Sequence, residues 1–159
     1  MSKEFFYRAH NVDRLPGRQG VFPNPFLNVD RRPLNTDLGL HYIFGLWFYK
    51  RFGLNYRSSA IMATGSLDQA LEFGGNIIRI VPEGDFSLCY SIYCRDLHIE
   101  TYEMAHDSLT CSKAIAEIFD FLDSLNYVEH KNTGIKEAVE SGNEVMIFAN
   151  SFKFNLIGG

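Results

Sequence analysis

The chain has 159 residues, of which 46% are hydrophobic and 21% are charged, and this composition is typical of a folded globular protein rather than a disordered one. Its length allows one domain with a substantial core, so we expect residues 1–159 to form a single domain. The formal net charge is −4 and the basic residues are dispersed, which excludes a global positive field and generic nucleic-acid binding.

Cysteine and histidine spacing gives no sign of a disulfide framework or a metal site. Three cysteines are present without a CxxC pair, and the five histidines are scattered without the spacing of metal ligands. The first residues lack the apolar run of a signal peptide, and the most apolar window, residues 38–48, is too short to span a bilayer. We therefore expect a cytoplasmic protein that binds no metal and does not engage a membrane.

The N-terminal region combines a short strand with a long irregular segment. Residues 5–10 alternate in a way that predicts a strand, with Arg8 and His10 on one face. Residues 11–35 are rich in Pro, Gly and Asn and predict a long surface connection that is functional rather than merely structural. Asn35 or Thr36 is expected to cap a helix that runs from Leu38 through Phe48 and stops near Gly53.

The central region predicts alternating strands and helices. Residues 55–66 are expected to form a strand that ends in small hydroxyl-bearing residues, after which Ser66 and Gln69 have the spacing of a capping box for a helix over 67–73. A strand over 76–81 is expected to close in a turn at 82–85. The remaining patterns predict an amphipathic helix from Ser112 to Leu125 and a shorter helix over 135–139.

The C-terminal region predicts a hairpin with an acidic residue at its start. Apolar residues alternate over 145–149 and again over 152–156, and Asn150-Ser151 between them has the composition of a tight turn. Glu144 opens the first strand, where a carboxylate is held rigidly yet stays near solvent. The whole pattern is that of an α+β fold.

Three of these features occur in an order that resembles the ADP-ribosyltransferase family. They are the aromatic-Arg step Tyr7-Arg8 on a first strand, the corner Thr64-Gly65-Ser66 before a short helix ending in Phe73, and Glu144 at the start of a Phe-rich strand. The resemblance is to the toxin-like branch, which is recognised by an arginine, a serine-rich corner and a glutamate. It implies a fold with two small antiparallel-rich sheets that form an NAD cleft with flanking helices.

The resemblance also implies roles for individual residues. Breaking the bond between nicotinamide and ribose produces an oxocarbenium-like sugar, which a nearby carboxylate stabilises. Glu144 and Arg8 are the implied catalytic residues. The implied NAD-binding residues are Arg8, His10, Tyr56, Thr64, Ser66 and Phe73, and residues 11–35 are expected to cover part of the NAD cleft.

The resemblance leaves the acceptor and the origin open. Arginine-modifying members carry Glu or Gln two residues before the catalytic glutamate, whereas this chain has Gly142, and Glu140 is out of register to replace it. The expected partner is a macromolecular acceptor, most simply a protein, together with a cognate immunity or inhibitor protein. The hypotheses are a transferase of the bacterial toxin, effector or phage-encoded kind acting in a cytosol, an NAD glycohydrolase, and an inactive binding or inhibitor protein on the same scaffold.

Overall fold

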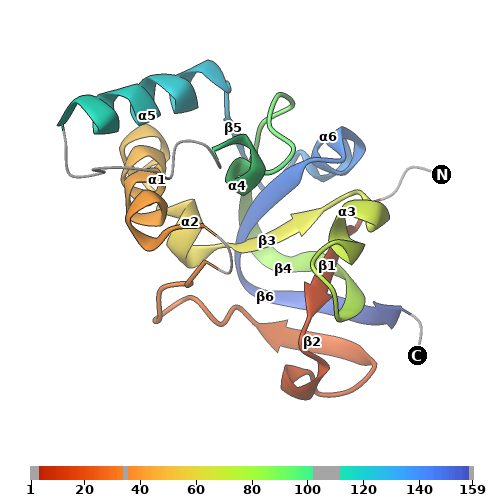
Figure 1. Ribbon diagram of the computed structural model, residues 1–159. Helices are drawn as coiled ribbons and strands as arrows, with labels where there is room; N and C mark the ends of the chain where they lie inside the picture. Colours follow the sequence, from red (N-terminus) through yellow and green to blue (C-terminus); the bar gives the residue numbers. More distant parts are fainter. Residues whose placement is uncertain (1–3, 34–35, 102–111, 158–159) are drawn as a thin grey trace.

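The computed structural model describes residues 4–33, 36–101 and 112–157, and it has an α+β architecture in which one sheet lies between two groups of helices (Figure 1). In chain order the elements are β1 (Phe6–His10), the 3₁₀ helix η1 (Val12–Arg14), β2 (Gln19–Pro23), α1 (Leu38–Phe52), α2 (Tyr56–Ser59), β3 (Ile61–Thr64), α3 (Leu67–Leu71), β4 (Asn76–Tyr90), α4 (Leu97–Glu100), α5 (Ser112–Ser124), β5 (Val128–Lys131), α6 (Ile135–Ser141) and β6 (Glu144–Ile157).

The six strands form one antiparallel sheet instead of the two small sheets that were expected. Its order is β2-β6-β3-β1-β4-β5, and β6 also pairs with β4 along most of its length. Because β6 contacts β3, β3 contacts β1, β1 contacts β4 and β4 returns to β6, these four strands close a circuit. The closed circuit brings the N-terminal strand β1 near the beginning of the C-terminal strand β6.

The predicted C-terminal hairpin is wrong, because β6 runs from Glu144 to Ile157 as one strand. Its core-facing residues change phase, from 145, 147 and 149 to 152 and 154. The shift lies opposite a bulge in β4 between Glu83 and Phe86, which pair with Ser151 and Ala149. A bulge inserts unpaired residues and bends a strand, so it changes the phase of a strand pair without reversing the chain.

Three other local expectations are also wrong. The turn expected at 82–85 is the bulged middle of β4, with Gly84 at φ +74°. The α1 helix is capped by Asp37, whose side chain accepts from the backbone N–H of Leu40, and not by Asn35 or Thr36. The strand expected over 55–66 is shorter, because the Asn55 side chain caps the helical turn α2 and only Ile61–Thr64 remain extended.

Other predicted elements are confirmed. The strand at the N-terminus is β1, the helix capped by Ser66 is α3, and the amphipathic helix after residue 111 is α5. The helix expected over 135–139 is α6, which extends to Ser141.

The start of β6 is buried on both faces. Val145 and Ile147 belong to a core cluster with Phe6 and Ile78, whereas Met146 belongs to a second cluster with helices α1 and α5. A strand packed on both sides cannot shift without disturbing both clusters. The backbone of Glu144, the residue that begins this strand, is therefore held rigidly.

Candidate functional site

A cavity of about 570 Å³ lies beside β1, β3 and the start of β6, and both Arg8 and Glu144 line it. The pairing register explains the meeting: Tyr7 lies opposite Thr64 across β1 and β3, and Thr64 lies opposite Glu144 across β3 and β6. The three segments singled out from the sequence thus come together on three adjacent strands.

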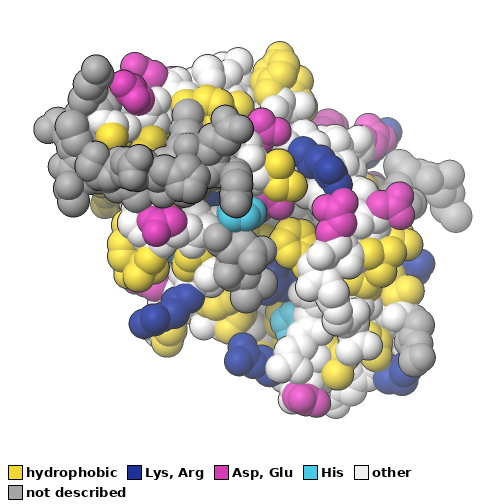
Figure 2. All heavy atoms as spheres, viewed as in Figure 1, with side chains coloured by type: hydrophobic (Ala, Val, Ile, Leu, Met, Phe, Trp, Pro, Cys, Tyr) yellow, Lys and Arg dark blue, Asp and Glu magenta, His cyan; other side chains and the backbone are white. Residues whose placement is uncertain are grey.

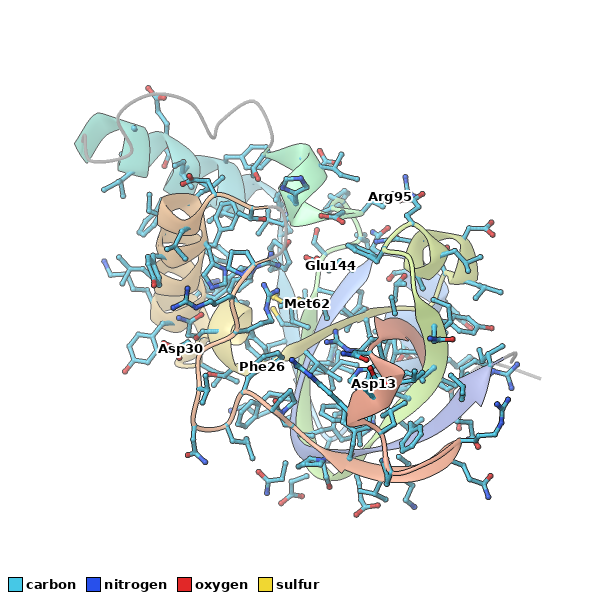
Figure 3. The ribbon with its side chains drawn as sticks, turned by 60° about the horizontal axis from the view of Figure 1, so that its bottom comes forward. Asp13, Phe26, Asp30, Met62, Arg95 and Glu144 are labelled. Atoms are coloured by element: carbon cyan, nitrogen blue, oxygen red, sulfur yellow. The ribbon has the colours of Figure 1, made fainter. Side chains whose placement is uncertain are left out.

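Glu144 is held by its backbone and by its side chain. Its N–H donates to the carbonyl oxygen of Arg95 at 2.8 Å, and one carboxylate oxygen, Oε1, accepts from Nη1 of Arg57 at 2.8 Å. The carboxylate side chain is 12% exposed. Figure 3 shows Glu144 between Arg95 and Met62, at the start of its strand. The carboxylate is therefore fixed at one oxygen and borders the cavity.

Arg57 is the main site residue that the sequence analysis missed. It lies on α2, its side chain is 3% exposed, and it also reaches the sulfur atoms of Met62 and Met146. Burial by itself would lower the pKa of Arg57, but the charge and hydrogen bond of Glu144, together with Tyr127 and Asp96, outweigh burial and the pKa is raised. The available signal was Asn55, a helix-capping residue whose recognition would have placed Arg57 on a helix rather than a strand.

Arg8 is anchored on β1, which supplies another part of the cavity lining. Its Nη1 donates to the carbonyl oxygen of Met62 at 2.7 Å, and its Nε donates to Nδ1 of His10 at 3.3 Å. Burial lowers the pKa of Arg8 to about 10, so the guanidinium still carries its charge at neutral pH. Because His10 accepts at Nδ1, its ring is neutral with the proton on Nε2, and both residues line the cavity.

The small-residue corner contributes Thr64 to the cavity. Thr64 Oγ1 donates to the carbonyl oxygen of Gly142 and accepts from the N–H of Ser66, which ties the corner to the start of β6. Ser66 uses its own hydroxyl to cap α3 by accepting from the N–H of Gln69, and it is not among the residues that line the cavity. The structure therefore brings Thr64 to the cavity and leaves Ser66 in a capping position.

Gly65 explains why the corner has a glycine at its centre. A Cβ atom at this position would collide with the backbone carbonyl of Val139 on α6. Because α6 packs this closely against the corner, β6 can begin at Glu144, three residues after α6 ends, next to the corner.

We expect Gly65→Ala to lower the free energy of unfolding by about 1–3 kcal/mol, the cost typical of overpacking a tight site. Urea denaturation measures the change. Gly17→Ala is the matched control, because a Cβ there has no neighbour within 4 Å. Equal stability of the two variants would contradict the steric role of Gly65.

The two aromatic residues predicted to bind a ring lie in different environments. Phe73 is 48% exposed and lines the cavity just after the end of α3. Tyr56 is fully buried, and its hydroxyl donates to the Glu129 carboxylate on β5 and accepts from the Ser87 hydroxyl on β4. The expected placement of Tyr56 is corrected: it packs in the core because α2 turns it inward, and it is not among the residues that line the cavity.

Positive groups outnumber negative ones around the cavity, although the chain as a whole is acidic. Arg8, Arg31, Arg32 and Arg57 line it together with Asp96 and Glu144. Arg31 comes from the long connection, and its Nε donates to the carbonyl oxygen of Arg57 at 2.9 Å. On the face drawn in Figure 2, Lys and Arg side chains form separate groups among acidic and apolar ones. The charged lining of the cavity is thus net positive, which suits an anionic ligand.

The long connection over residues 11–33, which was expected to be irregular but contains η1 and β2, supplies part of the cavity wall. Asn11, Val12, Phe26 and residues 31–33 line it. This segment is anchored where the N–H of Arg31 donates to the carbonyl oxygen of Ser58 at 2.8 Å. The segment that the sequence marked as functional therefore borders the same space as Glu144.

Two histidines should make the protein less stable in acid. Burial, helped by nearby arginines, lowers the pKa of His10 and of His41 to about 4, from an ordinary value of 6.5. Between these values the unfolded chain binds more protons than the folded one, so stability is complete above about pH 6.5 and falls as the pH drops towards about 4.

We expect urea denaturation between about pH 4 and 6.5 to show this loss of stability. In His10→Gln, the slope of the unfolding free energy against pH should fall by about one bound proton, because the titrating ring is gone. Gln can still accept the hydrogen bond from Arg8, so the local structure is kept. An unchanged slope in His10→Gln would contradict the buried neutral state of His10.

Among residues 4–33, 36–101 and 112–157, no cluster of His, Cys, Asp and Glu is arranged to hold a metal ion. No helix in these segments has the length and apolar character needed to cross a bilayer. No protein-family model, curated protein or solved structure matches the chain significantly.

Proposed function

We propose that the protein is an NAD-dependent mono-ADP-ribosyltransferase that cleaves the bond between nicotinamide and ribose and transfers ADP-ribose to a macromolecular acceptor. One observation carries the proposal: Tyr7-Arg8, Thr64 and Glu144, which follow the order of the family's three motifs, lie on adjacent paired strands around one cavity. Motifs this far apart in the sequence have no local reason to share a cavity, so their convergence supports a common function.

The cavity's residues fit the chemical parts of NAD. A diphosphate is an anion with oxygens that forked guanidinium donors bind well, and Arg8 and Arg31 stay charged at neutral pH because their pKa values are about 10 and 9. Phe73 offers an exposed ring for the nicotinamide. Thr64 is the corner hydroxyl at the cavity, whereas Tyr56 and Ser66 are committed elsewhere.

The proposed chemistry uses Glu144 where positive charge develops. When the glycosidic bond lengthens, the electron pair leaves with nicotinamide and the ribose gains oxocarbenium character. With one oxygen bound to Arg57, the other carboxylate oxygen of Glu144 is the one we assign to the sugar. In this proposal the bent strands β4 and β6 contribute residues to both halves of an ADP-ribosyltransferase-like cleft. The two halves belong to one sheet here, because β4 and β6 are hydrogen-bonded to each other.

We further propose that the acceptor is a protein and that the enzyme is a toxin, effector or phage-encoded modifier acting in a cytosol. Hydrolysis of NAD is the second candidate. Gly142, in the position of the family's acceptor-binding side chain, supports it: the residue has no side chain, φ is +67°, and its carbonyl already accepts from Thr64. An acceptor arginine therefore lacks the usual partner at this position.

Incubation with NAD labelled in its adenylate moiety tests the proposal. Transfer leaves the label on protein in a lysate or on the enzyme, whereas hydrolysis leaves free ADP-ribose in the absence of any acceptor. Nicotinamide release is expected in both cases and is measured by chromatography. Absence of nicotinamide release, with lysates of several bacterial hosts and without lysate, would contradict the enzyme and favour an inactive binding or inhibitor protein.

A further inference from the structure

A second carboxylate borders the cavity close to Glu144. Asp96 precedes α4, is 7% exposed, and lines the same cavity as Glu144. Its Oδ1 accepts from the N–H of His98 at 2.9 Å, which makes it the N-cap of α4 and fixes its side-chain orientation. Sequence reasoning did not select Asp96, because an Asp before a short helical turn is an ordinary capping residue.

A hydrogen-bond bridge fixes Asp96 beside the start of β6. The carbonyl oxygen of Arg95, the preceding residue, accepts from the N–H of Glu144 at 2.8 Å and from Nε2 of Gln69 at 2.9 Å. The bridge joins three elements, α3, β6 and the segment before α4. Asp96 is thus one residue away from a backbone atom that is bonded directly to Glu144.

The two carboxylates have different partners. Glu144 forms a 2.8 Å ion pair with Arg57, whereas the ion pairs found in the described parts of the chain include none to Asp96. The groups that act electrostatically on Asp96 are Glu144 on β6 and Arg57 on α2, together with the backbone N–H groups of His98 and Ile99 on α4. Burial first, and then Glu144, raises the pKa of Asp96 above its ordinary value, which makes its ionised form a stronger base.

We propose that Asp96 is the general base that takes the proton from the acceptor nucleophile. This inference rests on the proposed function and deepens it. It assigns to Asp96 the carboxylate that Gly142 cannot supply, and Glu140 does not compete because it is exposed and is not among the residues that line the cavity. Two carboxylates in different environments commonly divide acid-base work in this way.

The proposed step conserves electrons and protons. The bond between ribose C1′ and the nicotinamide nitrogen breaks, and its electron pair neutralises the pyridinium, which leaves as nicotinamide. A lone pair of the acceptor hydroxyl or of water forms the new bond to C1′. The proton of that nucleophile passes to the Asp96 carboxylate and then to solvent, while Glu144 stabilises the sugar and gains no proton.

Asp96→Asn tests the proposal, because Asn preserves the helix cap while removing the base. We expect kcat for NAD consumption to fall by about 10²–10⁴-fold, with KM for NAD within about twofold, and we expect the loss of rate on the acid side of the wild-type pH profile to disappear. Azide should restore nicotinamide release in Asp96→Asn, since this anion attacks C1′ without losing a proton. Asp120→Asn, an exposed change on α5, is the control, and Asp96→Ser is a second capping variant in case Asn perturbs the fold.

The outcomes separate this inference from the proposed function. Wild-type kcat and an unchanged pH profile in Asp96→Asn would overturn the role of Asp96 while leaving NAD cleavage intact. A loss of activity that azide does not restore would also overturn it, because that loss would be structural. A wild-type protein that releases no nicotinamide would overturn both.

Discussion

Replacing Glu144 by Gln is expected to reduce nicotinamide release from NAD by at least about 100-fold, the cost typical of removing one group that stabilises developing charge. The amide is nearly the same size as the carboxylate and its oxygen still accepts from Nη1 of Arg57, so the side chain keeps its place. What it lacks is the negative charge that, in the proposed mechanism, faces the oxocarbenium-like ribose. We therefore expect kcat to fall much more than KM for NAD rises.

Glu140→Gln is the matched control for this prediction, because it makes the same chemical change at an exposed residue near the end of α6. Far-UV circular dichroism should be the same for both variants and the wild type. Full NAD cleavage by Glu144→Gln would remove Glu144 from the mechanism. An equal loss in both variants would point to a nonspecific effect of lost charge.

Two of the elements that surround the candidate site could be predicted from the sequence, because the patterns that define them are local. The alternation around Arg8 defines a strand, and Ser66 with Gln69 defines a helix start, whatever the rest of the chain does. The family's motif order then connected these segments with Glu144. These segments meet in space because strands far apart in the sequence pair with one another, and the sequence pattern does not specify that pairing.

The long strands were misread because short-range patterns cannot distinguish a bulge from a turn. At Asn150-Ser151 the apolar phase shifts from odd to even positions, and a hairpin turn would produce the same pattern. The strand continues because Asn24 satisfies the backbone there: its side chain donates to the carbonyl oxygen of Ala149, and its N–H donates to that of Asn150. Those contacts come from a segment more than a hundred residues away.

Arg57 and Asp96 were missed for a related reason. Each carries out an ordinary local role, within or at the start of a short helical turn, and each becomes a site residue only through its approach to Glu144. Tyr56 was misplaced because the same turn, α2, directs it into the core while it directs Arg57 to the carboxylate. A single misassigned turn therefore changed the interpretation of two neighbouring residues.

Replacing Arg57 by Met is expected to lower the free energy of unfolding by about 3–5 kcal/mol, the range for breaking a buried ion pair by removing one partner. The variant keeps an unbranched side chain next to the sulfur atoms of Met62 and Met146, so little packing is lost. The loss comes instead from Glu144, whose carboxylate is 12% exposed and would have no counter-ion at its Oε1. Urea denaturation at pH 7 measures it.

A double-mutant cycle separates this electrostatic effect from a packing effect. If the unpaired charge causes the instability, Arg57→Met combined with Glu144→Gln should recover more than half of the loss, because neither partner of the pair is then left as an unpaired buried charge. Arg95→Met is the control: its ion pair with Glu72 is about half exposed on both sides, and an exposed pair contributes at most about 1 kcal/mol. A double variant as unstable as Arg57→Met would show that Arg57 stabilises the fold by packing, and that Glu144 keeps its position without an ionic partner.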